Sequence, residues 1–123
     1  MSSPPQISPA LQDRIARLQQ LEQQLVNLQV QLQQVAWELK ENNDAMKNLE
    51  GLSSTLKTFK ITESILVETD REILKKELED QKELLEFRES RTKQMLNQQK
   101  KAYEKLQKRV REELTQEGYN VSN

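Results

Sequence analysis

The chain has 123 residues, enough for one small domain or one long helical hairpin, and a formal net charge of −1. Hydrophobic residues make up 34% and charged residues 32%, a balance too polar for an ordinary compact core and typical of long amphipathic helices. The absence of Cys and His excludes disulfides, thiol nucleophiles and metal sites built from these residues, and removes the commonest general base. We therefore expect no metal, no cofactor and no enzymatic activity.

The sequence also predicts where the protein acts. No apolar run approaches the roughly 18 residues that a membrane span needs. The first residues have neither the basic start nor the apolar stretch of a signal peptide. We expect a cytoplasmic protein without membrane contact, and the near-neutral net charge gives no whole-chain attraction to nucleic acid.

The first predicted element is a helix over residues 9–50, preceded by a flexible tail over 1–8. Ser8 and Pro9 are typical of an N-cap and the first helical position, and Gly51 predicts a left-handed C-cap. Apolar residues at steps of four and three define a coiled-coil seam that Asn42 alone interrupts. The seam contains Leu21, Leu25, Leu28, Leu32, Val35, Leu39, Met46 and Leu49. It continues upstream, after a slip, through Leu11, Ile15 and Leu18.

The second predicted element is a β-hairpin region over residues 52–69, where β-branched and aromatic residues concentrate. We expect strands over 56–62 and 65–69 with the turn at Glu63 and Ser64, whose type stays open because neither is Gly or Asn. An isolated two-stranded hairpin is marginal in water, so the strands are expected to pair with strands of other chains. The residues expected to carry this oligomerisation are Phe59, Ile61, Ile65, Leu66 and Val67.

The third predicted element is a helix over residues 70–117, followed by a flexible tail over 118–123. Thr69 and Glu72 match a capping box, and Gly118 predicts a left-handed C-cap. The seam of this helix begins at Leu74, Leu78 and Leu85, meets Arg88 and Thr92, and resumes, shifted, through Leu96, Tyr103, Leu106, Val110 and Leu114. Two helices of similar length joined by a short segment predict a mainly α fold, an antiparallel two-helix coiled coil with a β-hairpin, in a single domain over 1–123.

This order of elements resembles the β subunit of prefoldin, in its archaeal form. The run from Phe59 to Asp70, FKITESILVETD, is similar to the family's aromatic-Lys-x-x-Gly-x-apolar-Leu-Val pattern. Glu63 stands where the family usually has glycine. Residues 76–78 and 82–88 and the Gln-rich first helix also look like the family.

The resemblance implies an ATP-independent chaperone subunit that holds unfolded polypeptides. Its implied partners are a prefoldin α-type subunit and further β subunits in a hexamer, non-native polypeptides, and a group II chaperonin that receives them. In the family the hairpins form a β-barrel platform, and the tips of the coiled coils hold the client.

Folding the chain about Ile61 brings the two ends of the chain to one distal tip, where a coiled coil lacks a next layer and frays. We expect the client-binding residues there: Ile7, Leu11, Ile15, Leu18, Leu106, Val110, Leu114 and Tyr119, with Val121 added by the tail. The alternative is a closed seam made by the same residues, because the period alone does not separate the two. A purely structural coiled-coil tether without clients is the corresponding alternative function.

Three further features allow two interpretations each. The Leu-rich stretch 21–35 lies roughly opposite 87–101, where polar seam positions predict loose pairing, unless Arg and Gln stems cover the leucines. Val26, Val30 and Trp37 form an off-seam stripe, either scattered surface residues or a contact with a neighbouring subunit or the inner wall of a client cavity. Residues 88–111 carry nine Lys and Arg against two Glu, which favours a solvated face over a nucleic-acid-binding arm.

Overall fold

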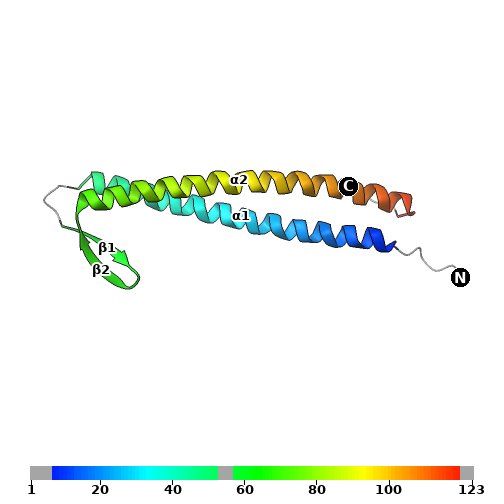
Figure 1. Cartoon of the computed structure of the whole chain (residues 1–123), viewed down its shortest axis with the longest axis horizontal. Coiled ribbons are helices and arrows are strands. Elements are labelled where there is room, and N and C mark those ends of the chain that lie inside the picture. The colour runs from blue at the N-terminus through cyan, green and yellow to red at the C-terminus, as the bar shows by residue number, and fades with distance from the viewer. Residues whose placement is uncertain (1–6, 53–56, 120–123) are drawn as a thin grey trace. The chain divides into compact units, whose positions relative to one another are not determined.

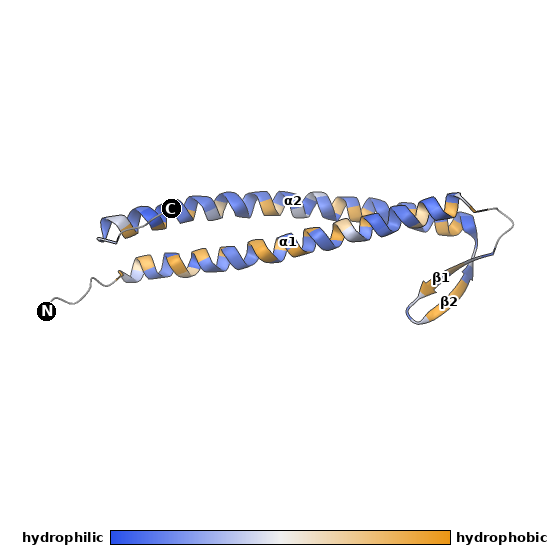
Figure 2. Ribbon diagram, turned by 180° about the vertical axis from the view of Figure 1, so that it is seen from behind, coloured by the Kyte–Doolittle hydropathy of each residue, from blue (hydrophilic) through white to orange (hydrophobic). Residues whose placement is uncertain are grey.

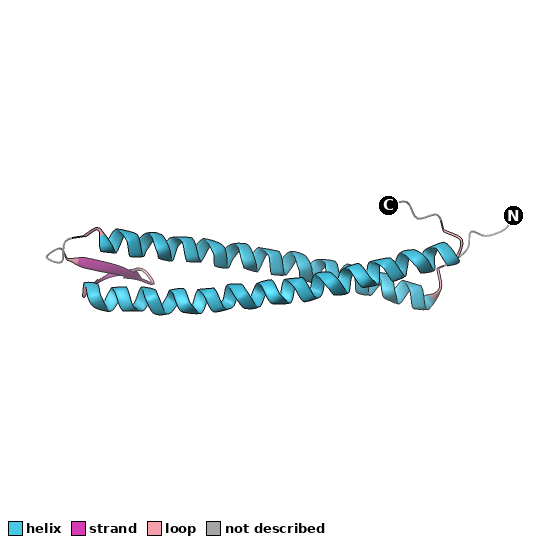
Figure 3. Ribbon diagram, turned by 90° about the horizontal axis from the view of Figure 1, so that it is seen from above, coloured by secondary structure: helices cyan, strands magenta, loops and turns pink. Residues whose placement is uncertain are grey.

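The structure is a computed structural model that describes residues 7–52 and 57–119 (Figure 1). Its elements are α1 (Pro9–Glu50), β1 (Thr58–Thr62), β2 (Ile65–Thr69) and α2 (Arg71–Gln116), so both strands lie in the segment of chain that joins the helices (Figure 3). This confirms the predicted fold class. Most of the predicted tails over 1–8 and 118–123 lie outside the described residues.

The chain divides into two compact units. The hairpin unit consists of residues 32–91, and the terminal unit consists of residues 1–31 and 92–123. Each unit contains a stretch of α1 beside a stretch of α2, and the hairpin unit also contains both strands. The single domain predicted over 1–123 stays a prediction.

The first helix begins as its sequence predicts and ends differently. The Leu11 amide donates to Ser8 Oγ at 3.3 Å and the Gln12 amide to the Ser8 carbonyl at 2.9 Å, so Ser8 is the N-cap. At the other end the prediction of a left-handed Gly51 is wrong, because Gly118 is the only glycine with positive φ in the described residues. Instead the Gly51 amide donates to the Lys47 carbonyl at 3.1 Å, which continues the helical pattern by one more bond.

The cap of α2 lies one residue later than predicted. The Asp70 carbonyl accepts the Leu74 amide at 2.9 Å, and Asp70 Oδ1 accepts the Glu72 amide at 2.7 Å. The predicted capping box of Thr69 and Glu72 is therefore wrong, because Thr69 still belongs to β2 and its carbonyl accepts the Thr58 hydroxyl. The negative charge of the short Asp70 side chain, directly before the first turn, also interacts favourably with the positive end of the helix dipole.

The end of α2 is a Schellman motif, as Gly118 predicts. Gly118 has φ 94°, its amide donates to the Thr115 carbonyl at 3.2 Å, and the Tyr119 amide donates to the Leu114 carbonyl at 2.9 Å. The left-handed conformation suits glycine because it has no Cβ. This motif turns the chain back at the end of α2 and holds Glu117 beside it.

The seam of α1 follows the predicted heptad. From Leu21 onward its buried positions are Leu21, Leu28, Val35, Asn42 and Leu49, each seven residues after the last. Buried Asn42 donates from Nδ2 to the Leu78 carbonyl at 3.1 Å, while its Oδ1 has no partner. A buried amide of this kind favours one register of the two helices at a cost in stability.

The seam of α2 runs without the predicted shift. Arg88 is exposed, and Glu89 takes the seam position four residues after buried Leu85. Half-buried residues then continue the alternation of three and four up to buried Val110: Thr92, Leu96, Gln99, Tyr103 and Leu106. The prediction that Arg88 belongs to the seam is therefore wrong, because apolarity alone misses polar residues that pack through their aliphatic stems.

The hairpin has an antiparallel register that pairs Thr58 with Thr69 and Thr62 with Ile65. Leu56, included in the predicted first strand, lies outside the described residues. In the turn, Glu63 has φ 57° and is the only non-glycine residue with positive φ in the described parts of the chain. Positive φ at the first central residue alone is the pattern of a type II′ turn, where glycine is preferred.

Candidate functional site

The hairpin is a two-stranded sheet with apolar side chains facing water. Within the described residues β1 and β2 pair only with each other, and Figure 2 shows hydrophobic colour on both strands. The five predicted oligomerisation residues are exposed by 41% to 76%: Phe59, Ile61, Ile65, Leu66 and Val67. Because an unpaired strand edge is a template for another strand, this surface is suited to pairing between chains.

One face of the hairpin lies toward α2. Lys60 Nζ forms an ion pair with Glu77 of α2 at 3.2 Å, and its neighbours Thr58 and Thr69 are half-buried. Residues on the opposite face include Ile61, which is 76% exposed, and its cross-strand partner Leu66. The outward face is therefore the more apolar and more accessible one.

The structure brings the predicted tip residues together at one end of the terminal unit, where α1 begins and α2 ends. Two of them are buried: Leu11 is 0% exposed and Val110 is 5% exposed. The other six are half-buried: Ile7, Ile15, Leu18, Leu106, Leu114 and Tyr119. Val121 lies outside the described residues. This end is a packed seam at rest, with a partly accessible apolar margin around Leu11.

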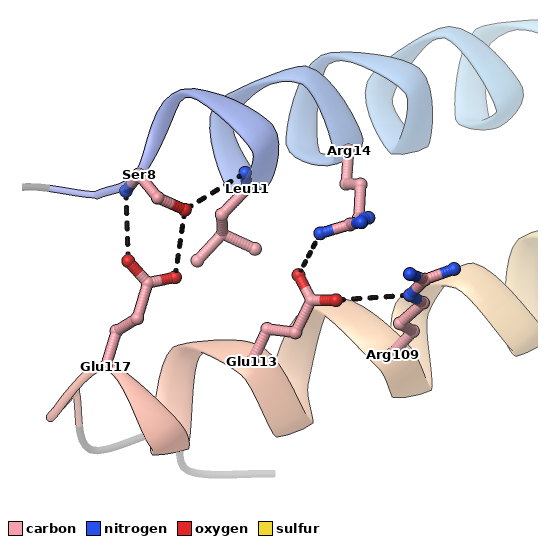
Figure 4. Close-up of polar contacts among 6 residues, drawn as sticks. All are labelled: Ser8, Leu11, Arg14, Arg109, Glu113 and Glu117. Carbon is pink, nitrogen blue, oxygen red and sulfur yellow. Dashed lines mark hydrogen bonds and ion pairs between the residues drawn. The ribbon is translucent and has the colours of Figure 1, made fainter.

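Two polar contacts flank Leu11, and Figure 4 shows its side chain between them, directed toward α2. In the first contact the Ser8 amide donates to Glu117 Oε1 at 3.0 Å, and the Ser8 hydroxyl donates to Glu117 Oε2 at 3.2 Å. In a capping box the N-cap amide is accepted by a carboxylate three residues later in the same helix. Here that position is Leu11, and Glu117 supplies the carboxylate after the end of α2. The N-cap of α1 is thus completed by the other helix.

The second contact joins the helices through Glu113. Arg14 Nη1 donates to Glu113 Oε2 at 2.6 Å, and Arg109 Nε donates to Glu113 Oε1 at 3.1 Å (Figure 4). Desolvation raises the pKa of Glu113, but hydrogen bonds from Arg109 and Arg14 and their charges outweigh it and lower the pKa below 4.5. Glu113 therefore stays ionised at neutral pH and holds both cations.

We call Ser8, Glu117, Arg14, Glu113 and Arg109 the clasp. Its role was not predicted from the sequence, because a bond such as that between Ser8 and Glu117 spans 109 residues of sequence. One local signal was present: Arg109 and Glu113 are four residues apart on one helix face. The contact across to Arg14 has no such signal.

A hollow of about 240 Å³ lies within the terminal unit, along the predicted loosely paired stretch. It is lined by Gln24, Asn27, Leu28, Gln31, Met95 and Gln99. Leu28 is buried and Met95 is 45% exposed, so the apolar surface available there is small. Gln99 Oε1 is buried without a partner, in keeping with imperfect pairing at this position.

The off-seam stripe and the basic stretch both face outward. Trp37 is 59% exposed and Lys40 Nζ lies 5.7 Å from its ring centroid, a cation–π contact. Val26 and Val30 are also exposed. All nine Lys and Arg residues of 88–111 are exposed on α2. A solvated face is the simplest account of this charge.

Exposed apolar residues on the outer side of α2 were not singled out from the sequence. Ile73, Leu84 and Phe87 are 57%, 53% and 62% exposed in the hairpin unit. Ile73 and Phe87 are two heptads apart, a spacing that places them on one side of the helix, away from the seam. This spacing could have predicted a second apolar side of the helix from the sequence.

Comparison with known proteins decides the family. Residues 12–117 match the family described as Prefoldin subunit. The chain belongs to the prefoldin family. It is 38% identical over 106 residues to prefoldin subunit beta of Sulfurisphaera tokodaii, covering 86% of this chain and 85% of that protein. It is 38% identical over 112 residues to prefoldin subunit beta of Pyrobaculum aerophilum, covering 91% and 86%.

The fold agrees with a solved prefoldin structure. The crystal structure of the prefoldin beta subunit from Thermococcus strain KS-1 matches with a TM-score of 0.78 and covers 90% of this chain and 97% of that one. At 24% identity this likeness concerns the fold. Together with the archaeal relatives, it confirms the predicted resemblance to the archaeal β subunit. Membership of this family implies that the chain is a chaperone subunit.

Two classes of site are missing from the described parts of the chain. Residues 7–52 and 57–119 contain no cluster of three or more Asp, Glu, His or Cys that could hold a metal ion. Over the same residues, no helix is both long and apolar enough to span a bilayer.

Proposed function

We propose that the chain is an ATP-independent holdase subunit acting in the cytoplasm. It captures unfolded polypeptides at the terminal end of its coiled coil and delivers them to a group II chaperonin. Its assembly partners are an α-type subunit and further β subunits, in a hexamer joined through the hairpins.

One observation carries the capture step. The eight predicted client-binding residues lie at one end of the terminal unit, and six of them are partly exposed around buried Leu11. Such an end has no next layer of side chains to complete its packing. An unfolded chain can bury apolar side chains against it, at about 25 cal/mol per Å² of area removed from water.

The test substitutes the half-buried margin and leaves the sealed centre intact. Ile15→Ser with Leu106→Ser removes partly accessible apolar area, and Leu84→Ser with Phe87→Ser is the matched control on the exposed outer side of α2. Aggregation of a denatured test protein is followed without ATP, at a temperature where the helix content of the variants is equal. We expect the first pair to lose most of the suppression and the control pair to keep it. Equal suppression by both variants would exclude this end as the capture site.

The second candidate function is a structural tether without clients. It is favoured by the complete burial of Leu11 and the 5% exposure of Val110, which describe a seam closed at rest. A wild-type chain, assembled with its partners, that suppresses no aggregation would support the tether and exclude the holdase.

A further inference from the structure

We propose that the clasp is a gate that holds the client-binding end closed and sets how readily it captures a client. This inference rests on the proposed function and names the regulation of that same site. It starts from a conflict between the two properties of this end: the residues expected to bind clients include Leu11, and Leu11 is 0% exposed.

The clasp is placed to control that burial. Leu11 lies between Ser8, the N-cap of α1, and Arg14, and these two residues are bonded to Glu117, directly after α2, and to Glu113 in α2 (Figure 4). Opening the seam at Leu11 separates the two helices here and therefore breaks both contacts. The apolar contact and the polar contacts must open together.

The interhelical capping box couples the gate to the start of α1. Ser8 Oγ accepts the Leu11 amide within α1, while the acceptor for the amide and hydroxyl of Ser8 itself is Glu117, directly after α2. When the clasp opens, the Ser8 amide and hydroxyl lose their acceptor, so the N-cap residue is held less firmly and the first turn, with Leu11, frays more readily. The Schellman motif at Gly118 keeps Glu117 in position for reclosing.

Closure serves a chaperone because exposed apolar ends of several chains would otherwise bind one another. The clasp residues are partly exposed, with Arg14 at 31% and Glu113 at 21%, so solvent competes for the ion pair and the gate opens at modest cost. A client that covers Leu11 and Val110 then offsets that cost by apolar burial.

Opening is tested with Glu113→Ala combined with Glu117→Ala in the full chain and its assembly. The matched control is Glu104→Ala with Glu112→Ala, which removes two exposed carboxylates of α2 from the same unit. Losing the cap interactions is expected to raise the open population about tenfold. Hydrogen exchange at the Leu11 and Gln12 amides should accelerate accordingly, and the amount of chain needed for half-suppression of aggregation should fall severalfold. The control should change neither quantity.

Locking tests the reverse. Because the chain has no cysteine, Arg14→Cys with Glu113→Cys places the only two thiols across the closed end, where a short bis-maleimide can join them. The cross-linked chain should lose capture, while the same variant without reagent should capture at least as well as wild type. Normal capture by the cross-linked chain would overturn the gate.

The outcomes separate the gate from the proposed function. Faster exchange at Leu11 with unchanged capture overturns the gate and leaves the holdase standing. A wild-type chain that captures nothing overturns the holdase and the gate together, even where exchange shows that the clasp opens.

Discussion

Replacing Ile61 and Ile65 by Asp should dissociate the oligomer without unfolding the chain. Ile61 is 76% exposed and Ile65 is 62% exposed, so in the separate chain both side chains already lie mostly in water. The substitution therefore removes little burial from the chain itself, and helix content should stay constant. In an assembly joined through hairpins, each isoleucine would contribute about 1.5–3 kcal/mol of apolar burial, and a buried aspartate adds a desolvation cost.

The magnitude follows from these terms. Losing two isoleucines from each hairpin weakens association by at least about 3 kcal/mol per chain, a factor of about 10² in the dissociation constant. Native mass measurement at micromolar concentration detects such a loss, and circular dichroism follows the helices. The matched control is Leu84→Asp, since Leu84 is 53% exposed on the outer side of α2. An unchanged mass of the hairpin variant would refute assembly through this surface.

Three further predictions concern single residues. Asn42→Leu should raise the melting temperature, by the equivalent of about 1–3 kcal/mol, because the buried unpaired Oδ1 is removed; a lower melting temperature would contradict this. Glu63→Gly should relieve the positive φ of 57° and slow hydrogen exchange of the hairpin amides by up to about tenfold, whereas faster exchange would show an unstrained turn. The lowered pKa of Glu113 means that its contacts with Arg14 and Arg109 stabilise the fold above pH 4.5 and are lost as pH falls through its folded pKa. The difference in melting temperature between wild type and Glu113→Gln should therefore vanish in acid, and a difference that persists at about pH 2 would contradict it.

Local signals predicted the ends of elements well where a single residue decides the backbone. Ser8 before Pro9 and Gly118 after α2 act through their own side chain or φ angle, and both took the predicted roles. The errors were of two kinds. Asp70 and Thr69 are both acceptable caps, and strand pairing of Thr69 decided between them. Glycine adopts both negative and positive φ, so the presence of Gly51 alone did not require a left-handed residue.

Seam and site were harder to predict for a different reason. The sequence suggested a break at Arg88 because apolar residues alone were followed, whereas the structure keeps the register by packing Glu89. The clasp could not be predicted from the sequence, because its partners are distant along the chain and because Ser, Arg and Glu are common on any coiled-coil surface. The residues near Leu11 were predictable as a group, but the degree of their burial was not.

The two apolar surfaces differ in what must happen before they are used, and this difference orders the events of the proposed mechanism. Ile61 is in water before any partner arrives, so pairing of hairpins gains its burial at once and requires no prior opening. Leu11 is already packed, so a client gains only the difference between its own contacts and those it displaces. In the proposed mechanism, assembly through the hairpins therefore needs no prior opening, while capture is favoured only for a chain that offers more apolar surface than the closed seam. A folded protein, whose apolar side chains are mostly inside, does not meet that condition, and an unfolded one does. On this reasoning the discrimination between unfolded and folded proteins arises from the burial of Leu11 itself, and a variant whose end stands permanently open should bind folded proteins with exposed apolar patches as well.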